Sequence, residues 1–317
     1  MTAVILINWN GADDTLACLA SLEKASGDFC VVVADNGSTD DSLSRIEAYI
    51  AQSSLRAHLL PLEHNWGFAA GNNRAIAFAR ETFAPDSYML LNNDTVVAPD
   101  FLQKLQAYRA AHPLCKVVGP LICYWSNPQR IWSCGGRLVF GSRKSFFRDA
   151  DVSTLPDRTP LPVSFISGCA LLADASLIDD EGRLLTERFF FGEEDYAFAL
   201  RMRKAGEKMV IVRDAVIWHK VASSARRVLT RSTLGRDYLY YLGRLIAARD
   251  YYGPLAFWVI RVLTVASSRG WFVRDGLTTK QALRLALRLY REAQTKEGIT
   301  YADFQAAVLD EDFCTTL

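Results

Sequence analysis

The chain has 317 residues, of which 50% are hydrophobic and 22% are charged, and this composition excludes an intrinsically disordered or collagen-like protein. At this length we expect one large domain or two smaller ones around a sizeable core. The net charge of +1 conceals an asymmetry, because residues 1–219 hold 21 Lys and Arg against 26 Asp and Glu, whereas residues 220–300 hold 15 against 5. The basic segment predicts an anionic partner such as a membrane surface.

The seven cysteines are scattered without a C-x-x-C pair, so the sequence predicts reduced thiols rather than a zinc site or a redox dithiol. Neither a signal peptide nor a membrane-spanning helix is expected, since the nearest apolar stretch, 254–268, is interrupted by Arg261. We therefore expect a cytoplasmic protein, either free or attached peripherally to the inner face of a membrane.

The first 111 residues alternate between strand and helix patterns. Continuous runs of apolar and β-branched residues predict strands over 3–7, 29–34, 59–62 and 88–91. Helices are predicted over about 13–24, after residue 40 to about 51, 69–83 and 99–111. This order predicts a mainly parallel sheet with helices on both faces.

The pattern loosens over residues 120–162, where glycines and prolines predict hairpins and a loop. A strand is expected over 163–172, a helix from about residue 192 to a C-cap at Gly206, and a strand over 208–212, after which residues 216–220 lead into the basic region.

The basic region after residue 220 is predicted to be helical. Leu283, Leu287 and Tyr290 can share one helix face, with arginines beside it. This face fits two interpretations, a helix that packs on the preceding domain and a helix that lies on a membrane surface. The aromatic residues of 238–258, which are five tyrosines, Phe257 and Trp258, favour an interfacial position.

Polar clusters directly follow the predicted strands, and ligands of open parallel sheets bind at the carboxyl ends of strands. Asparagine amides and an aspartate there can hydrogen-bond a base or ribose, and glycines allow a backbone to approach a ligand closely. Asx turns, tight turns and helix caps are the alternatives. The candidate nucleotide-sugar residues are Asn8, Asn10, Asp35, Asn36, Gly67, Gly71, Asn72, Asn92, Asn93 and Gly168.

Asp94 follows the fourth strand as an oxygen ligand suited to Mg²⁺ or Mn²⁺, with a helix-entry cap as the alternative. His219 can join it as a metal ligand or phosphate contact, or it can be structural. Glu194 and Asp195 follow three phenylalanines at a helix start. Apolar surroundings raise the proton affinity of a carboxylate, as a general base needs, although acids at this position also complement the helix dipole.

Several motifs are missing from the chain. The first strand-to-helix turn lacks G-x-G-x-x-G, which argues against a dinucleotide oxidoreductase, and neither a P-loop nor a G-x-S-x-G elbow is present.

The order of seven motifs resembles the family 2 inverting glycosyltransferases with a GT-A fold, and especially the bacterial rhamnosyltransferase-like branch. The resemblance covers about residues 2–222. Its motifs are ILINWNG at 5–11, DNGSTD at 35–40, NWGFAAGNN at 65–73, LNNDT at 91–95, SGCALL at 167–172, FFGEEDYAFALRMRKAG at 190–206 and WHK at 218–220.

The resemblance implies an α/β fold of GT-A type, with a mainly parallel nucleotide-binding sheet over 1–222 and a basic, helical extension over 223–317. Asn92-Asn93-Asp94 matches the family's D-x-D position. The first carboxylate of that motif is an amide here, so Asp94 would make the metal contact of this motif nearly alone. Asp195 would be the catalytic base beside Glu194, although the extra acid Glu193 permits a shift of one residue. His219 matches a histidine that contacts metal or diphosphate.

The resemblance also implies metal-assisted, inverting transfer from a dTDP-, UDP- or GDP-linked sugar to a hydroxyl of a saccharide or lipid-linked saccharide. Rhamnosyl transfer in surface polysaccharide synthesis is the reaction suggested by this branch. No nucleic acid partner is expected, and a homo-oligomer is left open. The 140–162 loop with Arg143, Lys144 and Arg148 either touches the acceptor or is solvated.

Two non-catalytic alternatives are a nucleotide-sugar-binding protein without transfer and a membrane-associated scaffold. A processive synthase is disfavoured, because the sequence has neither several spanning segments nor a Q-x-x-R-W motif.

Overall fold

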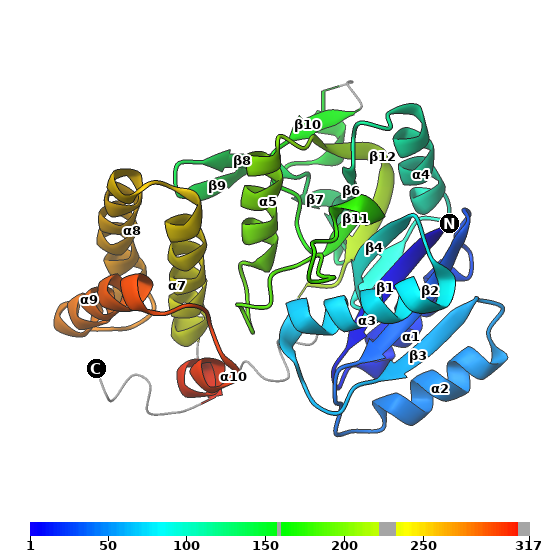
Figure 1. Ribbon diagram of the computed structural model, residues 1–317, viewed down its shortest axis with the longest axis horizontal. Coiled ribbons are helices and arrows are strands. Elements are labelled where there is room, and N and C mark those ends of the chain that lie inside the picture. The colour runs from blue at the N-terminus through cyan, green and yellow to red at the C-terminus, as the bar shows by residue number, and fades with distance from the viewer. Residues whose placement is uncertain (157–159, 222–232, 310–317) are drawn as a thin grey trace.

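The computed structural model describes residues 1–156, 160–221 and 233–309 (Figure 1). One large sheet runs through the molecule in the order β10-β12-β6-β11-β4-β1-β2-β3, with β5 paired to β12 and β7 paired to β6. The strands of this sheet are β1 (Thr2–Asn8), β2 (Phe29–Asp35), β3 (Ala57–Pro61), β4 (Ser87–Asn92), β5 (Thr95–Val97), β6 (Val117–Tyr124), β7 (Asn127–Ser133), β10 (Leu161–Val163), β11 (Ala170–Asp174) and β12 (Met209–His219). A separate hairpin joins β8 (Gly136–Val139) to β9 (Ser142–Ser145).

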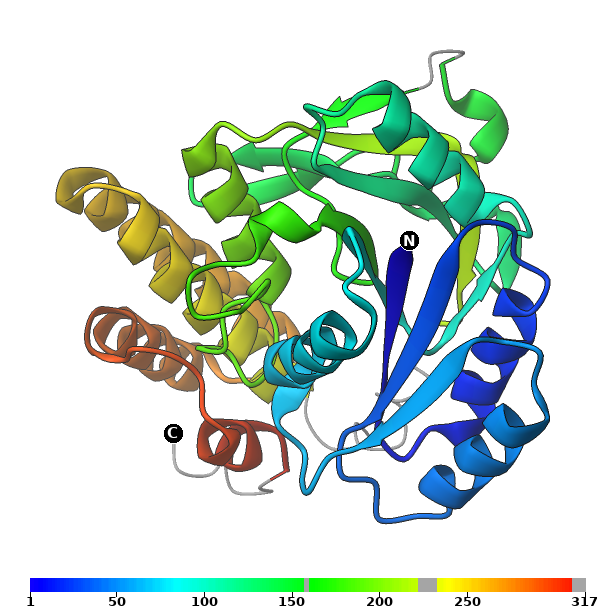
Figure 2. The same ribbon diagram turned by 45° about the vertical axis from the view of Figure 1, so that its right-hand side comes forward.

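Helices cover both faces of this sheet, as the sequence predicts. They are α1 (Ala12–Leu22), α2 (Ser42–Gln52), α3 (Gly67–Phe83), α4 (Phe101–Ala111) and α5 (Glu194–Ala205), followed by α7 (Thr233–Tyr251), α8 (Pro254–Arg274), α9 (Thr279–Thr295) and α10 (Tyr301–Phe304). Helices α1, α2 and α4 share one hydrophobic cluster with the strands, and α3 and α5 share another on the opposite face (Figure 2).

Strand β1 lies between β2 and β4, and all three are parallel. The register pairs Asn8 with Asp35 and Ile7 with Asn92, so the polar residues that end these strands meet at one edge. Alternating residues of each strand point to opposite clusters, with Ile5 in one and Val4 in the other. The β-α-β prediction for residues 1–111 is therefore confirmed.

The second half of the sheet is mixed. Strand β11 runs antiparallel to both β4 and β6, whereas β12 runs parallel to β6. The strand predicted over 163–172 is wrong, because this segment divides into β10 and β11 around a turn in which Ala170 N donates to Ser167 O. Conversely, the strand predicted over 208–212 is longer in the structure, where β12 continues to His219 with an irregular register between Val212 and Val216.

Six cysteines are buried free thiols, in agreement with the expected absence of disulfides within the described residues, and Cys314 lies outside them. Helix α5 ends at Gly206, which adopts φ +72° as predicted for a C-cap.

The C-terminal helices pack on the rest of the molecule. Tyr196 and Leu200 of α5 belong to the same hydrophobic cluster as α7, α8 and α9. The predicted domain boundary at 222–223 lies outside the described residues. Among the helices described, none is long and apolar enough to cross a bilayer.

The packing face of α9 differs from the one expected. Its buried side chains are Ala282, Leu285, Ala286, Leu289 and Ala293. Leu283 and Leu287, which were predicted to share one face, are instead 46% and 51% exposed. The interpretation of this face as the packing face is therefore wrong.

Candidate functional site

A cavity of about 510 Å³ opens where the parallel strands end. All seven motifs contribute to its wall, including the one at 190–206 that contains the start of α5. Its lining residues include Trp9, Asn36, Asn65, Gly67, Phe68, Asn92, Asn93, Asp94, Trp132, Gly168, Glu194, Asp195, His219, Arg236 and Tyr240.

Asn8 and Asp35 form a buried network behind this cavity. Asn8 Nδ2 donates to Asp35 Oδ2 at 2.7 Å, and Thr15 Oγ1 donates to Asn8 Oδ1 at 2.8 Å. Asp35 also accepts hydrogen bonds from the backbone and side chain of Ser38. Neither Asn8 nor Asp35 is among the lining residues, so in this structure they fix the loop after β2. Asn10 fixes the same loop, because its Oδ1 accepts from Thr39 N at 2.8 Å.

The start of α3 meets the Asn36 loop at close range. Asn36 Oδ1 accepts from Trp66 N, and its Nδ2 donates to Gly67 O. Gly67 has φ +80°, and a Cβ at this position would lie 2.5 Å from Phe190 O, so only glycine fits. A Cβ at Gly71 would meet the Asn36 amide at 3.3 Å.

Asn72 lies behind the cavity, where its amide donates to Phe68 O at 2.8 Å. Of the predicted nucleotide-sugar residues, Asn36, Gly67, Asn92, Asn93 and Gly168 line the cavity, whereas Asn8, Asn10, Asp35, Gly71 and Asn72 are not among its lining residues.

Asp94 and His219 converge although 125 residues separate them in the sequence. Strand β12 places His219 opposite Thr95, and His219 Nε2 lies 3.0 Å from Asp94 Oδ1. Burial opposes protonation of His219, but Cys169 and Asp94 raise its pKa to about 10. A cation would have to displace the proton that this raised pKa keeps on His219, and the pair would then offer one carboxylate and one imidazole. In the described part of the chain, no three His, Cys, Asp or Glu side chains gather as a metal site.

This small donor set fits a cation that takes most of its ligands from elsewhere. Mg²⁺ and Mn²⁺ are commonly held through one or two carboxylates plus substrate phosphates. Asn92 and Asn93 line the cavity beside the pair and add amide oxygens within the same wall.

Glu194 and Asp195 begin α5 and line the same cavity. Burial raises the pKa of both carboxyl groups, and their mutual repulsion raises that of Glu194 further. Arg143 opposes the rise at Asp195, and Gly168 N donates to Asp195 Oδ2 at 3.2 Å. Both residues are half-buried at the cavity wall, and their catalytic role stays a prediction.

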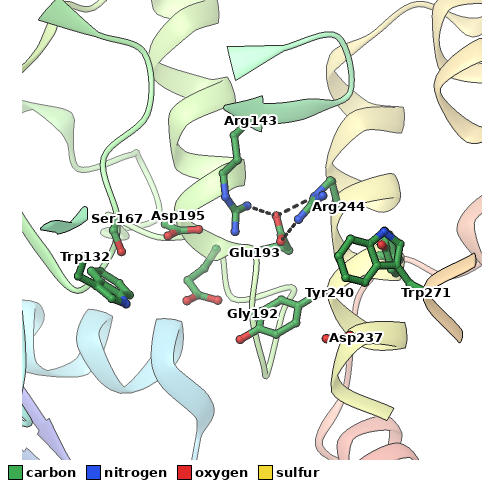
Figure 3. A pocket seen from close by; sticks show the side chains of 12 residues that line it. Trp132, Arg143, Ser167, Gly192, Glu193, Asp195, Asp237, Tyr240, Arg244 and Trp271 are labelled. Atoms are coloured by element: carbon green, nitrogen blue, oxygen red, sulfur yellow. Dashed lines mark hydrogen bonds and ion pairs between the residues drawn. The ribbon is translucent and has the colours of Figure 1, made fainter. Parts of the chain in front are cut away.

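Glu193 has a different environment. Its side chain is fully buried, and its carboxylate accepts from Arg143 Nη1 at 2.6 Å and Arg244 Nη2 at 2.9 Å (Figure 3). These two arginines hold the pKa of Glu193 below its usual range despite burial. A carboxylate held in this way is a weak proton acceptor, so the geometry favours Asp195 or Glu194 over Glu193 as a base.

Sequence reasoning missed several residues at the site. Trp132 comes from β7, and Arg236 and Tyr240 come from α7. Helix α7 begins 13 residues after the WHK motif at 218–220, and no local pattern indicates where it packs. The Arg143 side chain, which the sequence left between acceptor contact and solvated loop, is instead paired with Glu193.

Comparisons with known proteins agree with this architecture. The model of the family described as glycosyl transferase family 2 matches residues 3–164. The uncharacterized glycosyltransferase YfnE of Bacillus subtilis (strain 168) is 24% identical over 263 residues, which cover 69% of this chain and 64% of that relative. The chain therefore spans less than two thirds of that protein's length.

Two solved structures share the fold. A mannosyltransferase, PcManGT from Pyrobaculum calidifontis in complex with GDP-Man and Mn²⁺, has a TM-score of 0.56 at 18% identity, with 92% of this chain and 74% of that chain covered. TarS 1–349 from S. aureus in complex with UDP has a TM-score of 0.54 at 17% identity, with 100% and 92% covered.

Proposed function

Because this chain belongs to glycosyl transferase family 2, we propose that it moves a sugar from a nucleoside diphosphate donor to an acceptor hydroxyl with inversion at the anomeric carbon. The observation that carries this proposal is the convergence of two pairs on one cavity, Asp94 with His219 and Glu194 with Asp195. The first pair suits a cation and a diphosphate, and the second suits removal of a proton.

The donor would lie along the strand ends. Trp9, Asn36 and Gly67 line the part of the cavity formed by the first strands and α3, where a base and ribose fit. Arg236 of α7 lines the same cavity, and its buried Nε has no hydrogen-bond partner within the described residues. We propose that Arg236 contacts the diphosphate. The GDP-Man and UDP in the similar structures support a nucleotide sugar as the donor class.

Asp94 and His219 would hold Mg²⁺ or Mn²⁺ against the diphosphate. When bound, the cation supplies Lewis-acid stabilisation of the negative charge on the leaving group. The Mn²⁺ in the mannosyltransferase structure supports this assignment.

Asp195 would act on the acceptor. Its carboxylate takes the proton of the attacking hydroxyl while the hydroxyl oxygen bonds to the anomeric carbon and the bond to the diphosphate oxygen breaks. The raised pKa suits a base that works near neutrality, and the hydrogen bond from Gly168 N fixes one carboxylate oxygen. A single displacement from the face opposite the leaving group inverts the configuration.

We propose rhamnosyl transfer to a lipid-linked saccharide of a surface polysaccharide as the finer reaction, on the motif order alone. Peripheral attachment to an anionic membrane is part of this proposal. Helix α8 exposes Leu255, Trp258 and Leu263 at 77%, 52% and 60%, a pattern suited to an interface. Flotation with anionic and with neutral vesicles tests this attachment, and equal recovery in both would argue against it.

The donor is tested by a thermal-shift panel of UDP, dTDP, GDP and CDP with and without Mn²⁺. A ligand that binds the folded state alone stabilises it by about 2.7 kcal/mol at a hundredfold excess over its Kd. We expect a metal-dependent shift with one nucleotide. A shift without subsequent sugar transfer would favour the non-catalytic nucleotide-binding alternative, and no shift with any nucleotide would contradict the proposal.

A further inference from the structure

Glu193 determines where α5 begins, although its side chain does not cap the helix. Its φ of +67° lies in the left-handed region, which residues with a Cβ rarely adopt, and its side chain makes no capping hydrogen bond. Its carbonyl oxygen accepts the helical hydrogen bond from Ala197 N at 2.9 Å. The backbone of Glu193 therefore sets the positions of the next two residues, Glu194 and Asp195.

The Glu193 side chain is held from two directions. Arg143 Nη1 of β9 donates to Glu193 Oε2 at 2.6 Å, and Arg244 Nη2 of α7 donates to Oε1 at 2.9 Å. The guanidinium group of Arg143 also lies over the Phe165 ring, 4.8 Å from its centroid, and this contact fixes its direction. A strained backbone persists where its surroundings over-determine it, and the two arginines supply that constraint here.

The charges of this clamp, which consists of Arg143, Glu193 and Arg244, do not balance. One carboxylate faces two guanidinium groups, so the clamp carries one excess positive charge. Figure 3 shows the Arg143 guanidinium between the carboxyl groups of Glu193 and Asp195. Burial opposes the charge on Arg143, but Glu193 and Asp195 raise its pKa. The excess charge lies beside Glu194 and Asp195, and it can offset one further negative charge but not two.

We propose that Arg143 and Arg244 are positioning residues that act through Glu193, and that the excess charge of the clamp keeps one group of the carboxyl pair Glu194–Asp195 ionised. The role of the pair rests on the proposed function, because a base must be ionised before it can take the proton of the acceptor hydroxyl. The clamp itself belongs to the fold, and its effect on the pair can be measured without substrate.

Other titratable groups also surround the carboxyl pair. Burial raises the pKa of Tyr240 and of Cys169, so both stay neutral near pH 7, and burial raises the pKa of Asp237. In the part of the chain that the structure describes, these neighbours are Arg236, Asp237, Tyr240, Cys169, Asp94 and His219. They are the same in every variant below, so a difference between variants reports the clamp.

The test changes the charge of the clamp in both directions. Arg143→Met and Arg244→Met each remove a positive charge, Glu193→Gln removes a negative charge, and Arg143→Lys keeps the charge. Arg137→Met is the matched control, because Arg137 is an exposed arginine of the same β8–β9 hairpin. Carboxyl ¹³C NMR of the full chain follows the titration of the carboxyl pair without ligand, and the amide variants of the two carboxyl groups assign the signals.

We expect the titration to shift in opposite directions. Arg143→Met and Arg244→Met should move it to higher pH, because a charge that favours ionisation is lost, and Glu193→Gln should move it to lower pH. Arg143→Lys should stay close to wild type, and Arg137→Met should match it.

Transfer kinetics with dTDP-rhamnose, UDP-GlcNAc and GDP-mannose as donors and alkyl glycosides as acceptors give the second readout. The acidic limb of kcat/KM should move in the same directions as the NMR titration. Arg143→Met should therefore lose about tenfold in kcat/KM at a pH on that limb and recover as the pH rises.

The outcomes separate this proposal from the proposed function. Arginines that only support the fold would lower activity at every pH and leave the titration in place. An unmoved titration, or shifts of Arg143→Met and Glu193→Gln in the same direction, would overturn the clamp whether or not sugar is transferred. Opposite NMR shifts in a protein that transfers no sugar would support the clamp and refute the transferase proposal. Opposite NMR shifts with an unmoved acidic limb would support the clamp and count against the carboxyl pair as the base.

Discussion

Glu193 is predicted to be a major contributor to stability, because one buried carboxylate pairs with two arginines from different elements. Its side chain has no exposed surface, and it joins Arg143 of β9 to Arg244 of α7. Glu193→Gln keeps the shape and one acceptor oxygen but removes the charge that both guanidinium groups face. Hydrogen bonds to charged groups contribute about 1.5–3 kcal/mol each, and breaking a buried ion pair costs about 3–5 kcal/mol. We expect Glu193→Gln to lower the free energy of unfolding by about 2–4 kcal/mol.

Urea denaturation at pH 7 measures this change, with Glu181→Gln as the control. Glu181 pairs with Arg183 on the surface at 65% side-chain exposure, so its loss should have little effect. The pH dependence gives a second check. Because the pKa of Glu193 is lowered on folding, its contribution is present above the unfolded pKa and is lost as the pH falls through the folded pKa. A change below about 1 kcal/mol at pH 7 would refute the reasoning about desolvated charge.

The remaining predictions concern the candidate active site. Asp195→Asn should lower kcat by about 10²–10⁴ while nucleotide binding survives, and retained turnover in a transfer assay would exclude Asp195 as the base. The same variant should raise the Tm at pH values above the raised pKa of Asp195, because a carboxyl group with a raised folded pKa loses stability as the pH rises through it. Asp94→Ala should weaken Mn²⁺-dependent nucleotide binding by at least about tenfold in calorimetry, with equal affinities in both proteins as the contrary result. Gly67→Ala should destabilise the fold by about 1–3 kcal/mol, since the alanine would have φ +80° and a Cβ 2.5 Å from Phe190 O; an unchanged Tm would contradict this.

The sequence was most informative where function depends on strand ends. Parallel strands in register bring their carboxyl ends together, so residues such as Asn36 and Asp94 could be placed at one edge from the strand predictions alone. The family prediction is confirmed by the match over residues 3–164. Local signals also sufficed for the end of α5, because a glycine with positive φ is a local requirement.

The sequence was less informative where packing decides. Leucines at 283, 285, 287 and 289 place apolar side chains on both sides of α9, so the leucine pattern does not identify the buried face. The alanines at 282, 286 and 293 identify it in the structure, because small side chains allow close helix packing. The division of residues 163–172 into β10 and β11 depends on partners β12, β4 and β6, which lie far away in the sequence.

The same contrast between local patterns and packing applies to the residues that line the cavity. The residues that line the cavity from the strand ends carry recognisable motifs, whereas Arg236 and Tyr240, which line it from α7, belong to none. Motifs therefore identify the class of reaction in this chain, and the residues that α7 adds to the cavity follow from packing.

Helix α5 packs on two neighbours at once, and this limits how the protein can change. Phe198 and Met202 belong to the hydrophobic cluster that α5 shares with α3 and the sheet. Tyr196, Ala199 and Leu200 belong to the cluster of the C-terminal helices. An exchange of α7–α9 with those of a relative would therefore leave a mismatched face on α5 unless α5 were exchanged as well. Such chimeras should be joined before residue 190, so that α5 is exchanged together with the helices on which it packs.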